Sequence, residues 1–346
     1  MDTTRQATDR FSFLRATALV FLAAIFTVLP LNAQQSPVNP PPPPGYASPQ
    51  SQKPSDHSIK SRVDLVVLHV SVDDSRGQFF PGLTAGNFRV FEDRVEQNIS
   101  VFSHDDVPVT MGLVIDNSGS MRDKRPEVNA AALTFVETSN PQDEAFVVNF
   151  NDEFYLDTED DFTSNREELK QALSRIDSRG STALYDAIVG SLDHLKKGHK
   201  DKRVLLVITD GEDDASQMTL PETMRVAEES NAAIYAIGIY SADDRKHDKR
   251  EVRHAVKALT ELTEATGGKA YFPDSVDQVE AICTQVAHDI RNQYLLGYYP
   301  TNTAQDGTYR SVLVQLTPPR GAGKLTVRTR AGYYAPKAAP GATAGN

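Results

Sequence analysis

The chain has 346 residues, of which 39% are hydrophobic and 24% are charged, and its formal net charge is −11. This composition is typical of a globular protein with enough apolar residues for a sizeable core. The acidic balance excludes a general nucleic-acid surface, which needs clustered lysine and arginine, and argues against docking on anionic lipid. The single cysteine excludes an intrachain disulfide and a cysteine-rich zinc site.

Residues 1–33 have the pattern of an export signal. Three arginines precede the apolar run 16–29, and Ala33 closes a plausible cleavage site. The run is shorter than the roughly 20 residues that span a bilayer comfortably, so we expect cleavage and no membrane span after it, with an uncleaved membrane anchor as the alternative. The sequence therefore predicts an exported protein, located in the periplasm, on the cell surface or in the medium.

A proline-rich linker and a β-rich flank follow the signal. Residues 34–58 are rich in proline, serine and glutamine, a composition that favours an extended chain without a core. Residues 59–108 form the flank, with strands expected over 63–72, 88–91 and 97–102.

Residues 109–292 alternate between apolar strands and amphipathic helices. Strands are expected over 109–115, 145–150, 203–209 and 232–239. Helices are expected over 126–138, 165–176, 184–197, 222–230, 251–266 and 276–290. A capping box of Ser164 and Glu167 should start the second of these helices. The alternation predicts an α/β fold, with a doubly wound, mostly parallel sheet covered by helices on both faces.

A second β-rich flank occupies residues 293–336. Its strands are expected over 294–299, 310–316 and 325–330, and residues 337–346 have the composition of a disordered tail. Each flank is small for an independent core, so we expect the two flanks to pair into one β module. Cys283 lies on the apolar face of the helix expected over 276–290, which predicts a buried structural thiol.

Three polar loops stand where an α/β sheet binds its ligands, at the carboxyl ends of strands. One follows the strand expected over 109–115, another follows the strand over 203–209, and the third precedes the helix at 184. Hydroxyl and carboxylate oxygens are the ligands that hard cations prefer. The loops therefore predict a divalent-cation site, for Mg²⁺ with Mn²⁺ or Ca²⁺ as alternatives. Its candidate residues are Asp116, Ser118, Ser120, Thr182 and Asp210.

The Asp-x-Ser-x-Ser run at Asp116, the later Thr182 and the Thr-Asp-Gly-Glu strand end at Asp210 resemble the metal-ion-dependent adhesion site of von Willebrand factor A domains. The whole layout resembles the exported von Willebrand factor A-related proteins of Acidobacteria. The resemblance implies that Ser118, Ser120 and Thr182 contact the metal. It also implies that Asp116 and Asp210 ligate it directly or through water. One departure is Ser181, which stands where the family often has glycine.

The resemblance implies a protein-binding module for adhesion or complex assembly. Its bound cation would capture an exposed Asp or Glu of a protein partner. A structural envelope scaffold with a stabilising metal is an alternative. No feature of the sequence specifies the oligomeric state.

An enzyme is the main alternative from another class. The sequence contains no Gly-x-Ser-x-Gly elbow, no His-Glu-x-x-His motif and no Gly-x-x-x-x-Gly-Lys phosphate loop. A metal-dependent phosphatase with Asp116 as nucleophile would usually have a second acid two residues on, where this chain has Ser118. We therefore expect no enzymatic activity, with a metal-dependent hydrolase or phosphatase as the less favoured alternative.

Overall fold

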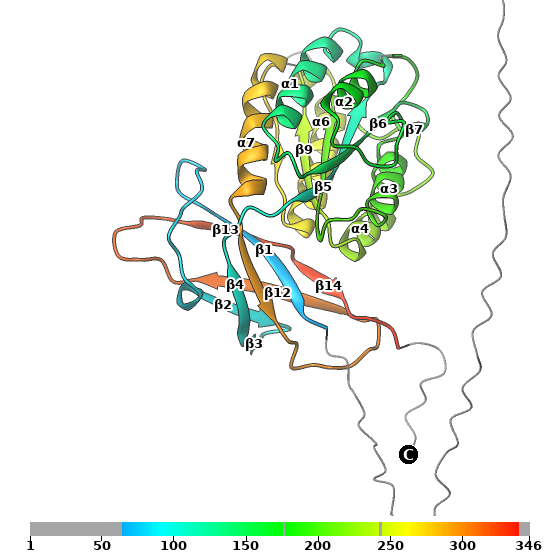
Figure 1. The fold of residues 1–346 in the computed structure, drawn as a ribbon. Coiled ribbons are helices and arrows are strands. Elements are labelled where there is room, and N and C mark those ends of the chain that lie inside the picture. Colours follow the sequence, from blue (N-terminus) through cyan, green and yellow to red (C-terminus); the bar gives the residue numbers. More distant parts are fainter. Residues whose placement is uncertain (1–63, 176, 242–243, 339–346) are drawn as a thin grey trace, which may run out of the picture. The chain divides into compact units, whose positions relative to one another are not determined.

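The computed structural model describes residues 64–175, 177–241 and 244–338 (Figure 1). The expected export signal, the linker and most of the expected tail lie outside these residues. All described residues belong to one compact unit. No helix among them is long and apolar enough to cross a membrane.

A six-stranded sheet forms the centre of the α/β layer. Its strand order is β10-β9-β8-β5-β6-β7, and all neighbours are parallel except β6 and β7. The strands are β5 (Val109–Asp116), β6 (Glu144–Phe150), β7 (Phe154–Leu156), β8 (Lys202–Thr209), β9 (Ala233–Gly238) and β10 (Ala270–Tyr271). Every residue of β5 is buried, as expected for a central strand covered on both faces.

Helices cover both faces of this sheet (Figure 1). One face packs against α1 (Arg125–Glu137), α2 (Arg166–Leu173) and α7 (Val279–Arg291). The other face packs against α3 (Leu184–Leu195), α4 (Leu220–Glu229) and α6 (Lys249–Thr266). A short helix, α5 (Asp244–His247), precedes α6. The predicted doubly wound, mostly parallel α/β fold is thus confirmed.

Strands from both flanks share two further sheets. Their orders are β13-β1-β11-β4 and β14-β12-β2-β3, so each sheet mixes strands from before and after the α/β layer. The strands are β1 (Val66–Asp73), β2 (Phe88–Glu92), β3 (Val95–Gln97), β4 (Ile99–Ser103), β11 (Tyr294–Tyr298), β12 (Tyr309–Leu316), β13 (Thr326–Arg328) and β14 (Gly332–Tyr334). Residues of both sheets form one apolar core, and we call this part the β module.

Some local predictions differ from the structure. The single strand expected over 97–102 is interrupted at Asn98, where the chain passes from β3 in one sheet to β4 in the other. The cap of α2 is Asn165, whose side chain accepts a hydrogen bond from the Glu167 backbone, and not Ser164. Asn165 alone supplies the acceptor that the first helical turn needs, so the predicted capping box is wrong.

The boundaries 109 and 292 of the expected α/β domain stay a prediction that a fragment can test. Gln293, the first residue beyond position 292, contacts both the β module and the α/β layer. Its buried side chain donates to Ser71 Oγ on β1 at 3.0 Å and to Tyr235 Oη on β9 at 3.4 Å. We therefore expect a fragment of residues 109–292 to unfold at lower urea concentration than the mature chain. Equal midpoints would show that the two parts are energetically independent.

Cys283 is fully buried on α7, as predicted. Burial raises the pKa of its thiol to about 12, so almost no thiolate forms near neutral pH. We expect no reaction of the native protein with a thiol-specific disulfide reagent, and one thiol per chain after unfolding in urea. Rapid labelling of the native protein would contradict this burial.

Candidate metal centre

Two of the three predicted loops meet directly at the carboxyl edge of the six-stranded sheet. Asp116 ends β5 and Asp210 follows β8, and these two strands are parallel neighbours. Ser118 Oγ lies 3.1 Å from Ser120 Oγ, and Ser120 Oγ donates to Asp210 Oδ1 at 2.7 Å. Hydroxyl and carboxylate oxygens from two separate loops therefore converge at one point.

Asp116 is the most deeply placed member of the site. Its carboxylate accepts a hydrogen bond from the Ser118 backbone at 2.8 Å and one from the Thr209 hydroxyl at 2.6 Å. Burial, and then the nearby charge of Asp210, raise the pKa of Asp116 to about 6. Two neighbouring carboxylates that are nearly out of water favour a cation between or beside them.

The third loop brings Thr182 to the same edge. A side chain on Gly211 would begin 3.1 Å from Thr182 Oγ1, which places the threonine hydroxyl beside the Asp210 loop. The Thr182 backbone donates to Asp214 Oδ1 at 2.7 Å, while the backbone of Ser181 donates to Asp152 Oδ1 at 2.8 Å. Ser181 is thus held towards a different loop, and Thr182 is the residue of the pair next to Asp210.

Gly180 makes this loop geometry possible. Its φ is +72°, a conformation that side-chain-bearing residues rarely adopt. A Cβ atom here would also lie 2.0 Å from Asp152 Oδ2. The glycine therefore allows Asp152 to approach closely enough to hold the Ser181 backbone.

The acidic residues that follow Asp210 mainly hold structure together. Asp213 Oδ1 accepts from the Tyr185 backbone at 3.1 Å, at the start of α3. Glu212 lies 3.4 Å from His254 on α6. These carboxylates, with Asp214, are engaged within the chain.

Two basic residues that the sequence did not single out border the site. Lys124 Nζ lies 2.6 Å from Asp210 Oδ2, and the Asp210 side chain is fully buried. The fully buried Arg125 donates to the Asp116 backbone carbonyl at 3.3 Å and to Asn149 Oδ1 at 2.8 Å. Lys124 thus supplies the positive charge that Asp210 attracts, and Arg125 holds the end of β5 from behind.

Tyr240 adds an unpaired hydroxyl near the site. It lies two residues beyond β9, and its buried Oη atom has no hydrogen-bond partner among the described residues. Burial, and then the charges of Asp210 and Asp116, raise the pKa of this hydroxyl.

The donor set fits a hard divalent cation. All the side chains that converge are oxygen donors, as Mg²⁺ prefers, and the Lys124 ammonium already stands as a cation on Asp210. Within the described ranges, no group of three or more His, Cys, Asp or Glu side chains could hold a metal. A cation at this edge would therefore depend on the hydroxyls of Ser118, Ser120 and Thr182.

The fold and this edge define a doubly wound α/β domain with a polar cluster at its strand ends. Residues 111–212 match the family model of the von Willebrand factor type A domain, and all five predicted site residues fall inside that stretch. The chain therefore contains a von Willebrand factor A-type domain. No curated protein matches the sequence.

Several solved structures are similar to this chain at low sequence identity. They include the conserved hypothetical protein BatB from Bacteroides thetaiotaomicron (17% identity, 53% of this chain, 98% of that chain, TM-score 0.42). A von Willebrand factor type A protein from Catenulispora acidiphila gives 12% identity over 72% of this chain and 74% of that chain, with a TM-score of 0.45. The vWF domain of the type V pili tip protein Mfa5 from Porphyromonas gingivalis is 12% identical over 54% of this chain and 95% of that chain, with a TM-score of 0.45.

Proposed function

We propose that this domain binds one divalent cation, with Mg²⁺ as the favoured ion, and thereby captures an acidic side chain of a protein partner. The residues that would hold the cation are Asp116, Ser118, Ser120, Thr182 and Asp210. The observation that carries the proposal is the convergence of Ser118, Ser120 and Asp210 oxygens, 2.7–3.1 Å apart, at the carboxyl edge of the sheet. Von Willebrand factor A domains generally serve adhesion and protein–protein interaction.

The donor chemistry explains why the site would attract an acidic partner. A bound cation would supply positive charge that the two carboxylates and the neutral hydroxyls only partly offset, so an external carboxylate could complete its coordination. Ser118 is oriented for this role by its backbone hydrogen bond to Asp116. Ser120 is oriented by its hydrogen bond to Asp210.

A role as a binding site is favoured over that of a stabilising metal. The Lys124 ammonium pairs with the buried Asp210 carboxylate at 2.6 Å, so one of the two carboxylates of the site has a counter-charge from the chain itself. We therefore expect the protein to keep its fold in EDTA, to lose only its binding, and to act without catalysis. The location we propose is outside the cytoplasm, based on the export signal expected over residues 1–33.

A capture experiment tests this function. Mature protein is immobilised and exposed to envelope and secreted fractions in Mg²⁺ or in EDTA. Asp116→Ala is run alongside, and Asp193→Ala is the matched control, since Asp193 is an exposed carboxylate on α3 that pairs with Lys196. Circular dichroism checks that each variant is folded.

We expect a protein to be captured by the wild type and by Asp193→Ala in Mg²⁺, and by neither in EDTA. Asp116→Ala should capture nothing in either buffer. Capture that is indifferent to Mg²⁺ and to Asp116 would show that another surface binds the partner, and would overturn the proposal.

A further inference from the structure

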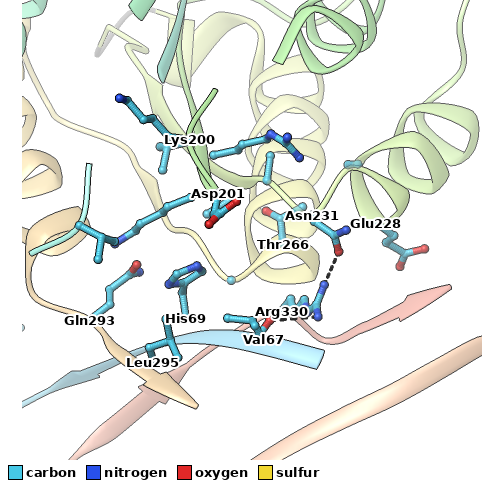
Figure 2. A pocket seen from close by; sticks show the side chains of 18 of the residues that line it. Val67, His69, Lys200, Asp201, Glu228, Asn231, Thr266, Gln293, Leu295 and Arg330 are labelled. Carbon is cyan, nitrogen blue, oxygen red and sulfur yellow. Dashed lines mark hydrogen bonds between the residues drawn. The ribbon is translucent and has the colours of Figure 1, made fainter. Parts of the chain in front are cut away.

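A large cavity lies at the amino edge of the six-stranded sheet, away from the candidate metal centre. Its volume is about 670 Å³, within the range of roughly 300–1,000 Å³ typical of small-molecule sites. It is lined by the starts of β8 and β9, the ends of α4 and α6, and β1 and β11 of the β module (Figure 2). The cavity therefore lies where the α/β layer meets the β module.

Basic side chains dominate the charged lining. The cations are Lys200, Lys202, Arg203 and Arg330, and two imidazoles, His69 and His199, accompany them. Only Asp201 and Glu228 are acidic. In a chain whose net charge is −11, this concentration of positive charge marks a local preference for an anion.

Both arginines of the lining have a donor atom with no hydrogen-bond acceptor in the described part of the chain. The Nε atoms of Arg203 and Arg330 are both buried without a hydrogen-bond partner there. Arg330 is fixed in place, because it donates to the Val67 carbonyl at 3.1 Å and to the Asn231 side chain (Figure 2). Because these Nε atoms are buried, a ligand in the cavity would not reach them, and the two arginines contribute to the site through their positive charge.

His69 lines the cavity as an imidazole that burial keeps neutral near neutral pH. Its imidazole makes no hydrogen bond within the described residues, and it lies on β1 between Gln293 and Val67 in the close view (Figure 2). Burial, and then the charges of Lys202 and Arg330, lower the pKa of His69 to about 3. Burial also lowers the pKa of Lys202 to about 8, so keeping this side chain charged in the cavity costs free energy.

Much of the remaining wall is apolar, and Asn231, Thr266 and Gln293 add polar side chains to it. Leu65 just before β1, Val67 on β1 and Leu295 on β11 line the side formed by the β module. Val204 and several alanines line the side formed by the α/β layer. A fully polar ion would leave these walls unused, whereas a ligand with an apolar body would cover them.

We propose that this cavity binds a small amphipathic anion, namely a carboxylate or a phosphate on a short apolar body. The anionic head group lies among Lys200, Arg203 and Arg330, and the apolar body packs on Leu65, Val67 and Leu295. The site is independent of the metal-dependent function proposed above, because it uses other residues at the opposite edge of the sheet.

Titration of the full mature protein with matched probes tests the proposal. The probes are octanoate, octyl phosphate and the uncharged octanol, and binding is followed by calorimetry in EDTA, so that no metal can hold the anion. We expect at least one of the two anions to bind on the order of tenfold more tightly than octanol. The better of the two identifies the head group as carboxylate or phosphate.

Variants then locate the binding. Arg203→Gln should weaken the better anion on the order of tenfold, and Lys200→Gln should weaken it by a smaller factor. Lys324→Gln, an exposed lysine between β12 and β13 outside the lining, is the matched control and should bind as the wild type does. If Arg203→Gln does not fold, Lys200→Gln decides. Failure of both anions to bind, octanol binding as tight as theirs, or unchanged affinity in the folded cavity variants would overturn the proposal.

Discussion

Replacing EDTA by millimolar Mg²⁺ should raise the thermal midpoint of the wild-type protein, and Asp116→Asn should remove this rise. A ligand that binds only the folded state at 100 times its dissociation constant stabilises that state by about 2.7 kcal/mol. For a domain of this size, that corresponds to a shift of about 5–10 °C. The asparagine keeps the shape of the side chain but removes one of the two carboxylate charges of the site. Differential scanning calorimetry in the two buffers measures the effect.

A second variant, at Lys124, should have the opposite effect on the affinity for Mg²⁺. Lys124 Nζ and a metal ion would compete for the same Asp210 carboxylate, which lies 2.6 Å from the ammonium. Lys124→Gln should therefore bind Mg²⁺ more tightly than the wild type, on the order of tenfold. Calorimetric titration with Mg²⁺ compares the two. Weaker binding by Lys124→Gln would show that the lysine supports cation binding instead of competing with it. A wild-type thermal midpoint that is the same in EDTA and in Mg²⁺ would contradict the metal site itself.

The candidate site could be predicted from sequence where one topological rule places its residues. Asp116 and Asp210 directly follow buried strands, and parallel neighbours bring their carboxyl ends to one edge. Lys124 could not be predicted in the same way. Lys124 precedes α1, and its side chain extends back to Asp210. No periodic pattern in the sequence indicates a contact of this kind. Tyr240 could have been found, because it lies just beyond the end of β9 at the same edge.

The β module was predictable in composition but not in detail. The hairpin between β2 and β3 turns at Asp93 and Arg94, both with positive φ, where the usual signal would be Asn-Gly or Asp-Gly. The cavity was not predictable at all, since His69, Arg203 and Arg330 come from three distant parts of the chain. Local patterns specify elements, whereas such a site depends on how the β module packs against the α/β layer.

The largest expected loss of stability comes from Arg328, which joins the β module to α7. Its guanidinium contacts Asp73 Oδ2 at 2.8 Å and Asp289 Oδ2 at 3.3 Å, and both carboxylates are nearly inaccessible to water. Asp289 also accepts a hydrogen bond from the Tyr271 hydroxyl at 3.1 Å. Arg328→Ala would leave two buried carboxylates facing each other without a cation.

Breaking a buried ion pair by removing one partner costs about 3–5 kcal/mol, so we expect Arg328→Ala to lose that much free energy of unfolding at pH 7. The deficit should shrink in acid. Burial already raises the pKa of Asp289 above its ordinary value of 3.8, and loss of Arg328 raises it further. A carboxyl whose pKa is higher in the folded state binds protons more tightly there, so the variant regains stability relative to the wild type as the pH falls. Urea denaturation at pH 7 and pH 5 measures both effects.

Arg89→Ala is the matched control for Arg328→Ala. Arg89 pairs with Glu96 at 2.6 Å in the same β module, but both side chains are about half exposed. Water and side-chain freedom leave such a pair worth about 0–1 kcal/mol, so this variant should lose little stability at either pH. If the two arginine variants were equally stable, the junction between the β module and α7 would not depend on the buried charges. If the deficit of Arg328→Ala were the same at pH 5 as at pH 7, the loss would come from packing of the arginine side chain and not from the two unpaired carboxylates.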